Sequence, residues 1–193
     1  MARKTGTTEY AVLGMLAAGP GSGYDLKKRI EGSVAHFWQE SYGQIYPILA
    51  RLAAEGLVDR RLERQKGKPD RQVYSITPTG LERLGRWLGE PAKEESVRNE
   101  FLLKIFFGRR RPVDETIRHV EQFKERQQTL ARVFAERERE LRGKHSAHPG
   151  LPYWLMTLHF GQYRADALLR WCEETIKTLE RLGRASAKRA RSR

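Results

Sequence analysis

Residues 41–76 read SYGQIYPILARLAAEGLVDRRLERQKGKPDRQVYSI, and the hydrophobic period changes in the middle of this stretch. In the first half, from Ile45 to Leu52, apolar residues recur at i, i+3, i+4 and i+7, which is the spacing of one helical face. From Leu57 onward apolar and charged residues alternate as in a strand, on both sides of the turn-forming segment KGKPD. The pattern predicts a helix that ends near Gly56, followed by a basic β-hairpin.

A proline lies inside the expected helix. Pro47 cannot donate a hydrogen bond to the carbonyl of Gly43, and its ring presses on that turn. Either the first turn is distorted, or the regular helix begins nearer Tyr46. Ser41 and Gln44 have the spacing of a capping box, but the same two residues can also face DNA, because one helical face can serve both purposes.

Two short helices are expected before this stretch. The first carries an apolar cluster over residues 10–17 and stops at Gly19-Pro20-Gly21. The second has Ser22 as its N-cap, with Asp25 in the first turn, and closes at Gly32.

A fourth helix is expected after the hairpin. Thr77 supplies the N-cap and Pro78 the first helical position. One face of this helix carries Leu81, Leu84 and Leu88, and Gly89 and Pro91 end it. Three helices, a two-stranded ribbon and a further helix form a winged helix-turn-helix, whose third helix enters the DNA major groove while the ribbon lies along the backbone or minor groove. We therefore expect residues 1–91 to be a DNA-binding domain.

The second half is wholly helical in pattern, so the fold class is mainly α. Pro91–Ser96 is a charged linker, and residues 97–182 are expected to form an all-helical domain. Residues 101–107 are apolar almost all round, which predicts a short helix enclosed on most sides. Asp114 is expected to cap a long charged helix that runs towards Arg142.

The last helix is expected from Pro152 to about Leu182, with a basic tail at 183–193. Its apolar residues recur in alternating steps of three and four, as in a coiled-coil seam. Two long helices and one short helix form an assembly too thin to bury this much surface, so self-association is expected. The residues assigned to dimerisation are Leu155, Leu158, Leu169, Cys172, Ile176 and Leu179.

The chain is strongly basic. It has 37 Lys plus Arg against 24 Asp plus Glu, a net charge of +13 and a pI of about 10.2, which favours a polyanionic partner. The excess gathers at residues 60–71, at Arg109-Arg110-Arg111 and at residues 181–193. A terminal tail of this kind is by default a solvated, frayed end, and a specific contact is the alternative.

Several function classes have little support. No apolar run is long enough to cross a membrane, and the polar start lacks a secretory signal, so a cytoplasmic protein is expected. The single Cys172 excludes an internal disulfide, and with His145 and His148 it makes a poor metal site. Because no enzyme motif is present, we expect no catalysis, no cofactor and no metal.

The predicted winged helix offers a set of candidate DNA contacts. The exposed face of its third helix offers Ser41, Tyr42, Gln44, Tyr46 and Arg51, and the hairpin tip offers Lys66, Lys68 and Arg71. Gln44 is the best candidate for reading a base.

Two other functions are alternatives. In the first, the winged helix binds another protein and its positive charge serves solubility, which predicts binding that is insensitive to salt. In the second, the protein is an accessory subunit of an enzyme, but no residue of the sequence supports this.

Five stretches of the first half are distinctive: LGML at 13–16, GSGYDL at 21–26, FWQESYGQIYPIL at 37–49, EGLV at 55–58 and YSITPTG at 74–80. Together they closely resemble the PadR family of transcriptional regulators. RNEFLLKIFF at 98–107 resembles the start of the helical C-terminal domain in the longer subclass of that family.

This resemblance implies a homodimeric repressor that binds palindromic operator DNA through its winged helix and dimerises through its helical domain. In some members of the family small aromatic effectors release the DNA, so a small-molecule effector is a further expected partner. The resemblance places Ser41, Tyr42, Gln44 and Tyr46 on the recognition helix, and Tyr24, Lys27 and Lys28 on the helix before it.

Overall fold

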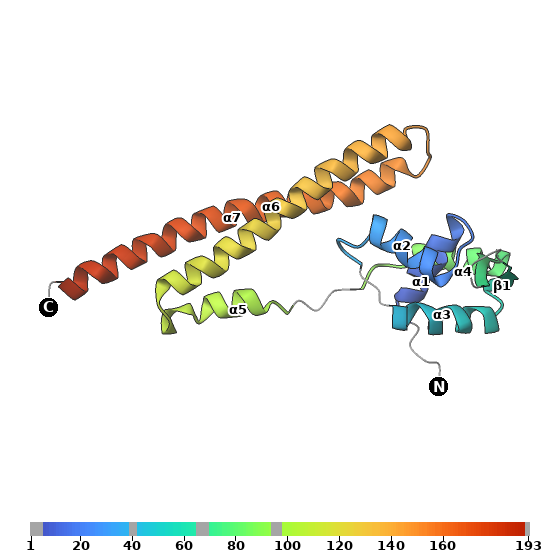
Figure 1. Cartoon of the computed structure of the whole chain (residues 1–193), viewed down its shortest axis with the longest axis horizontal. Coiled ribbons are helices and arrows are strands. Elements are labelled where there is room, and N and C mark those ends of the chain that lie inside the picture. Colours follow the sequence, from blue (N-terminus) through green and yellow to red (C-terminus); the bar gives the residue numbers. More distant parts are fainter. Residues whose placement is uncertain (1–5, 39–41, 65–69, 94–97, 192–193) are drawn as a thin grey trace. The chain divides into compact units, whose positions relative to one another are not determined.

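The computed structural model describes residues 6–38, 42–64, 70–93 and 98–191. The chain divides into two compact units, Met1–Glu94 and Glu95–Arg193, and each is described by itself (Figure 1). The fold is mainly α, as predicted, and the described residues of the first unit add a two-stranded antiparallel sheet.

The first unit is a winged helix-turn-helix, as predicted. Its elements are α1 (Thr8–Ala17), α2 (Gly23–Ser33), α3 (Tyr42–Ala54), β1 (Val58–Glu63), β2 (Arg71–Ile76) and α4 (Pro78–Leu88). Aliphatic side chains of the three N-terminal helices and of β1 form its core, namely Val12, Leu13, Leu16, Leu26, Ile30, Ile45, Leu49, Leu52, Leu57 and Val58. This core fixes the side of α3 that faces inward and leaves its other side to solvent.

The hairpin is confirmed, with antiparallel pairing from Val58 opposite Ile76 to Glu63 opposite Arg71. The turn between α1 and α2 extends it, because Gly21 and Tyr74 exchange two backbone hydrogen bonds of 3.0 Å. The ribbon is therefore joined to the helix-turn-helix by backbone hydrogen bonds. Its tip, residues 65–69, lies outside the described residues.

Two of the predicted helix caps are confirmed. The amide of Asp25 donates to the hydroxyl of Ser22, and the amide of Ser22 donates to the carboxylate of Asp25, which completes a capping box at α2. At α4 the hydroxyl of Thr77 accepts the amide of Gly80, and Pro78 is the first helical residue. The Ser41–Gln44 capping box cannot be followed, since Ser41 lies outside the described residues.

Helix α3 passes through Pro47 and begins at Tyr42, so the alternative of a start nearer Tyr46 is wrong. Pro47 and Gly43 are both exposed. Water can therefore satisfy the Gly43 carbonyl that loses its intrahelical partner.

The apolar face predicted for α4 is only partly correct. Leu84 packs against the core, but Leu81 and Leu88 are exposed. The ring of Trp87 packs instead, stacked on Tyr10 of α1 with 4.5 Å between centroids. An aromatic residue one position away from the leucine stripe thus makes the contact with α1.

The second unit contains α5 (Glu100–Phe106), a 3-10 turn (Gly108–Arg110), α6 (Val113–Lys144) and α7 (Leu151–Arg191). Helices α6 and α7 pack along each other as an antiparallel pair (Figure 1). Two expectations for their ends are wrong. Pro112 rather than Asp114 precedes α6 as its N-cap and makes no side-chain cap, and α7 does not end near Leu182 but continues to Arg191.

The short helix α5 is not enclosed within the chain, contrary to the prediction. Phe101 stacks on Phe123 of α6 at 4.4 Å and meets Trp171 of α7 edge-on. Ile105 is half-buried, and four further large apolar side chains of this segment are exposed, namely Leu102, Leu103, Phe106 and Phe107. The apolar pattern therefore marks a surface that the described residues of the helical unit leave exposed.

Candidate nucleic-acid interface

Helix α3 has one buried and one exposed side. Ile45, Leu49 and Leu52 are fully buried, whereas Gln44 and Tyr46 lie on the exposed side, where Tyr46 retains 50% of its accessible surface. Amide and phenol groups on an exposed helical side can reach base edges or phosphates. Tyr42 is the first residue of α3.

The start of α2 contacts the exposed side of α3. A Cβ built on Gly23 would lie 2.7 Å from Cε1 of Tyr46, so the tyrosine ring rests directly on the glycine backbone. The neighbouring Tyr24 is half exposed, and the ammonium of Lys28 lies 4.7 Å above its ring centroid. Tyr46 of α3 thus lies against the start of α2, where Tyr24 and Lys28 are in contact with each other. Lys27 lies on the same helix in an ion pair of 3.1 Å with Glu31.

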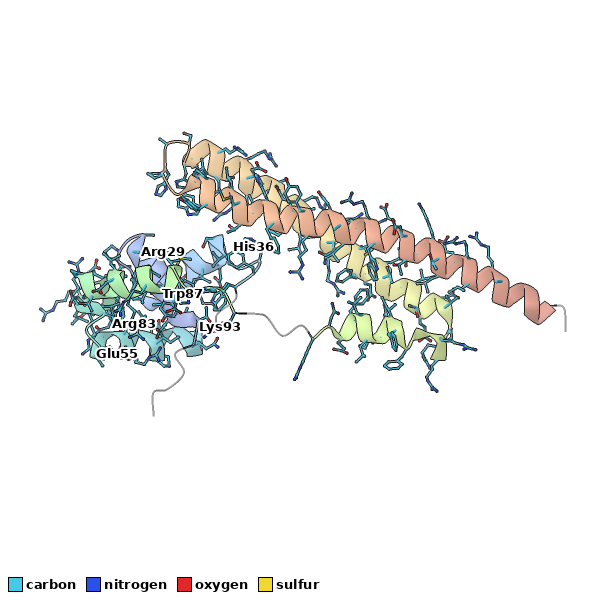
Figure 2. The ribbon with its side chains drawn as sticks, turned by 180° about the vertical axis from the view of Figure 1, so that it is seen from behind. Arg29, His36, Glu55, Arg83, Trp87 and Lys93 are labelled. Carbon is cyan, nitrogen blue, oxygen red and sulfur yellow. The ribbon has the colours of Figure 1, made fainter. Side chains whose placement is uncertain are left out.

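Arg51 has a structural role that the sequence did not indicate. Its guanidinium lies 2.8 Å from the carboxylate of Glu9, which is fully buried, and Arg83 of α4 binds the same carboxylate at 3.0 Å. Arg83 also binds Glu55, which directly follows the last residue of α3, at 3.0 Å, and both residues are labelled in Figure 2. These four charges join α1, α3 and α4, so Arg51 holds α3 in place.

The burial of Glu9 was not predicted from the sequence, because a charged residue near a polar N-terminus is usually solvated. A signal was nevertheless present. Glu9 precedes Val12, Leu13 and Leu16 by three, four and seven residues, so it continues the apolar stripe of α1 into the core.

Arg71 is also committed to protein carboxylates. It lies 3.3 Å from Asp25 of α2 and 3.2 Å from Glu63 of β1. Hydrogen bonding from the backbone amide of Ser22 lowers the pKa of Asp25, and the charge of Arg71 lowers it further. Arg71 therefore anchors the ribbon to α2.

The other basic residues of the ribbon differ in what the structure describes. Lys66 and Lys68 lie outside the described residues, while Arg60 and Arg61 of β1 are exposed and add positive charge to the ribbon.

In the helical unit, the residues predicted for dimerisation face α6 of the same chain. Leu155, Leu158 and Cys172 are buried, and Leu169, Ile176 and Leu179 are half-buried. Burial raises the pKa of the Cys172 thiol, which keeps it protonated. The heptad pattern identified a packed seam correctly, and Leu155 and Leu158 of this seam pack with Phe134 of α6. The role of the seam in dimerisation stays a prediction.

An exposed apolar stripe on α7 was missed. Tyr153, Met156, Phe160 and Tyr163 follow steps of three, four and three, and each is 63–73% exposed. This exposed stripe lies on the side of α7 turned away from the packed seam. Its spacing was visible in the sequence, but the denser seam beside it dominated the pattern.

Within the described ranges, no group of three or more His, Cys, Asp or Glu residues gathers in a way that could hold a metal ion. In the same ranges, no helix combines the length and the apolar character needed to cross a bilayer.

Comparison with known families gives two adjacent matches. Residues 12–86 match the PadR-like family of transcriptional regulators, and residues 97–180 match the virulence activator alpha C-terminal domain. The negative transcriptional regulator PadR of Bacillus subtilis is 37% identical over 101 residues, which are 51% of this chain and 55% of that protein. The probable transcriptional regulator Rv1176c of Mycobacterium tuberculosis is 35% identical over 82 residues, or 42% of this chain and 43% of that protein. The chain thus spans about half the length of these curated relatives.

Solved structures resemble the chain over most of its length. Bacillus subtilis PadR in complex with operator DNA has a TM-score of 0.79 and 25% identity, and the match covers 90% of this chain and 99% of that one. The same protein in complex with p-coumaric acid has a TM-score of 0.72 and 24% identity, with 90% and 96% covered. The two matched domains, their order along the chain and the shared fold place this chain in the PadR-like family of transcriptional regulators, in the longer subclass with a large helical C-terminal domain.

Proposed function

We propose that the protein is a transcriptional repressor that binds palindromic operator DNA as a homodimer in the cytoplasm. One observation carries the proposal: α3 presents Gln44 and Tyr46 on the side opposite its buried face, within a PadR-like domain. A recognition helix of this kind enters the major groove, where a glutamine amide can make two hydrogen bonds to an adenine. The operator complex of Bacillus subtilis PadR supports the assignment.

The proposed contacts divide by role. Gln44 reads a base, and the other contacts position the helix on phosphates and sugars: Ser41, Tyr42, Tyr46, Tyr24, Lys27, Lys28, Lys66 and Lys68. Arg51 and Arg71 bind protein carboxylates, and through them they hold α3 and the ribbon in place.

Dimerisation is proposed through the uncovered apolar surfaces of the helical unit. The exposed stripe of α7 and the apolar side chains of α5 are large groups that solvent would otherwise surround. A second copy covers both by two-fold symmetry, because each chain supplies the same surfaces. The two α3 helices then meet half-sites about one turn of DNA, roughly 34 Å, apart. The packed seam from Leu155 to Leu179 supports this interface by holding α7 against α6.

Release of the operator by a small aromatic effector is part of the proposal, supported by the p-coumaric acid complex of Bacillus subtilis PadR. Such a ligand would act by changing the angle between the two units across the Pro91–Ser96 linker, so that both recognition helices no longer meet successive grooves. Titration of aromatic acids into the operator complex tests this point: release by one of them supports it, and retention with all of them contradicts it.

Replacing Gln44 by Ala tests the base-reading role. We expect binding to the operator to weaken by about 1–3 kcal/mol, roughly 5- to 150-fold, while binding to random duplex stays nearly unchanged. Gln122→Ala, which removes an exposed amide from α6, is the matched control and should alter neither affinity. Equal losses on both duplexes for Gln44→Ala would contradict a base contact.

The salt dependence of DNA binding tests the alternative function. If the affinity of the unaltered chain for duplex DNA does not weaken as the salt concentration rises, a protein-interaction module is favoured instead.

A further inference from the structure

The C-terminal turns of α7 run past the helix pair. At Gly183, a Cβ would lie 3.0 Å from Cγ1 of Val113, and Val113 is the first residue of α6. Helix α7 continues for eight residues beyond this point, to Arg191, which is about 12 Å at 1.5 Å per residue. Figure 1 shows this end of α7 extending past the start of α6. These last turns therefore have no α6 segment to pack against.

The extension has little apolar surface. The packed seam of α7 carries large side chains at Ile176 and Leu179, but its continuation carries Gly183, Ala187 and Ala190. A helix that docks into a protein groove or lies on a bilayer needs a broad face of large apolar residues. The extension provides no such face.

What the extension provides is positive charge. Residues 181–193 contain six basic residues and no acidic one, whereas α6 balances eight basic with seven acidic residues. Four of the six follow steps of three, four and three in the sequence, which is the spacing of one helical face. We call this set the C-terminal basic face: Arg181, Arg184, Lys188 and Arg191.

An ion pair with Glu180 is described for Arg184 of this face. Glu180 is the last acidic residue of the sequence. Arg184 lies 3.9 Å from it, at the long end of ion-pair distances, and both side chains are well exposed. Exposed pairs of this kind contribute little stability. Like charges at helical spacing repel one another, so a polyanion would relieve the repulsion and stabilise the extension.

We propose that the C-terminal basic face binds the phosphate backbone of DNA beside the operator, as a second and sequence-independent contact of each chain. The inference rests on the proposed operator binding, which brings DNA and the extension into one complex. Phosphate contacts depend on positive charge and need no apolar surface, and the extension has six basic residues and no acidic one. An anionic membrane is disfavoured because no large apolar residue follows Gly183 in the extension.

The test compares three variants of the full chain. The first replaces Arg181, Arg184, Lys188 and Arg191 by Gln. The second replaces the three arginines among them by Lys, which keeps the charge. The third replaces four exposed arginines of α6 by Gln and is the matched control: Arg118, Arg126, Arg132 and Arg139. Affinity is measured between 50 and 200 mM salt on a minimal operator duplex, on the operator with long flanks and on random duplex.

We expect the Gln variant of the basic face to bind the flanked operator and random duplex more weakly. The slope of log affinity against log salt should become shallower by about 0.9 for each phosphate that the variant no longer neutralises. The minimal operator, the Lys variant and the α6 control should keep the slopes of the unaltered chain. Equal thermal midpoints of all variants show that none of these effects comes from unfolding.

Two results would overturn the inference. One is an unchanged slope on flanked operator and random duplex for the Gln variant. The other is binding of the unaltered chain to phosphatidylglycerol vesicles that disappears in the Gln variant, with no change on DNA, which would assign the basic face to a membrane. The proposed function is tested separately, by the affinities of the unaltered chain for operator and random duplex. If these two affinities are equal, operator recognition is contradicted, whether or not the extension binds DNA.

Discussion

At the scale of single residues, a buried carboxylate orients the recognition helix. Glu9 binds Arg51 of α3 and Arg83 of α4, so removing it leaves two partly buried guanidinium groups without their shared partner. We expect Glu9→Ala to lower the free energy of unfolding by about 2–4 kcal/mol. Urea denaturation measures this change. Glu31→Ala, which removes the exposed partner of Lys27, should cost about 0.5 kcal/mol or less, and equally small effects for both variants would show that Glu9 is not a central contact.

Gly23 controls the position of Tyr46. A methyl group at this glycine would overlap the tyrosine ring, so Gly23→Ala should push the ring outward and destabilise the chain by about 1–3 kcal/mol. Operator binding should weaken as well, because Tyr46 belongs to the proposed interface. Gly85→Ala, at a helical glycine of α4 with open space around it, should instead stabilise by up to about 1 kcal/mol. Urea denaturation and operator titration of both variants measure these effects, and similar behaviour of the two would contradict the close contact.

At the scale of elements, Glu138 links α6 to α7 in a pH-dependent way. Hydrogen bonds from Gln162, then Arg142 and His159, lower its pKa from the ordinary 4.5 to about 2. A carboxylate with a lowered pKa stabilises the folded state above its unfolded-state pKa, and this stabilisation disappears as the pH falls from about 4.5 towards 2. We expect Glu138→Gln to be less stable than the unaltered chain at pH 7.

The difference between Glu138→Gln and the unaltered chain should shrink below pH 4.5, because the glutamine cannot titrate. Urea midpoints of the two chains from pH 7 to pH 3 measure it. Glu136→Gln, at an exposed position of the same helix, is the control. A difference that stays constant over this range would contradict the assigned hydrogen bonds.

The elements that local chemistry determines were predictable from the sequence. The Ser22 and Thr77 caps, the hairpin and the order of the winged helix depend on neighbouring residues, and the structure confirms them. Contacts between distant residues were not predictable. Whether Arg51 faces DNA or Glu9, forty-two positions away, depends on tertiary packing. Likewise, the apolar pattern of α7 does not identify its packing partner, which can be α6 or a second chain.

At the scale of the whole molecule, the proposed homodimer depends on the exposed stripe of α7. We expect Phe160→Glu to convert the dimer to a monomer, because a carboxylate would be buried without a partner at a two-fold interface. Sedimentation measures the mass. Operator affinity should fall when the dimer is lost, since each monomer then binds one half-site alone. Gln128→Glu, which adds the same charge at an exposed position of α6, should remain dimeric. A Phe160→Glu chain that stays dimeric would place the interface elsewhere.

Selection of bound duplexes from a random pool examines the whole molecule as a reader of DNA. If two α3 helices enter successive major grooves through a two-fold dimer, the retained duplexes share one palindrome with half-sites about ten base pairs apart. A pool that shows no common sequence after repeated rounds would contradict sequence-specific recognition by α3.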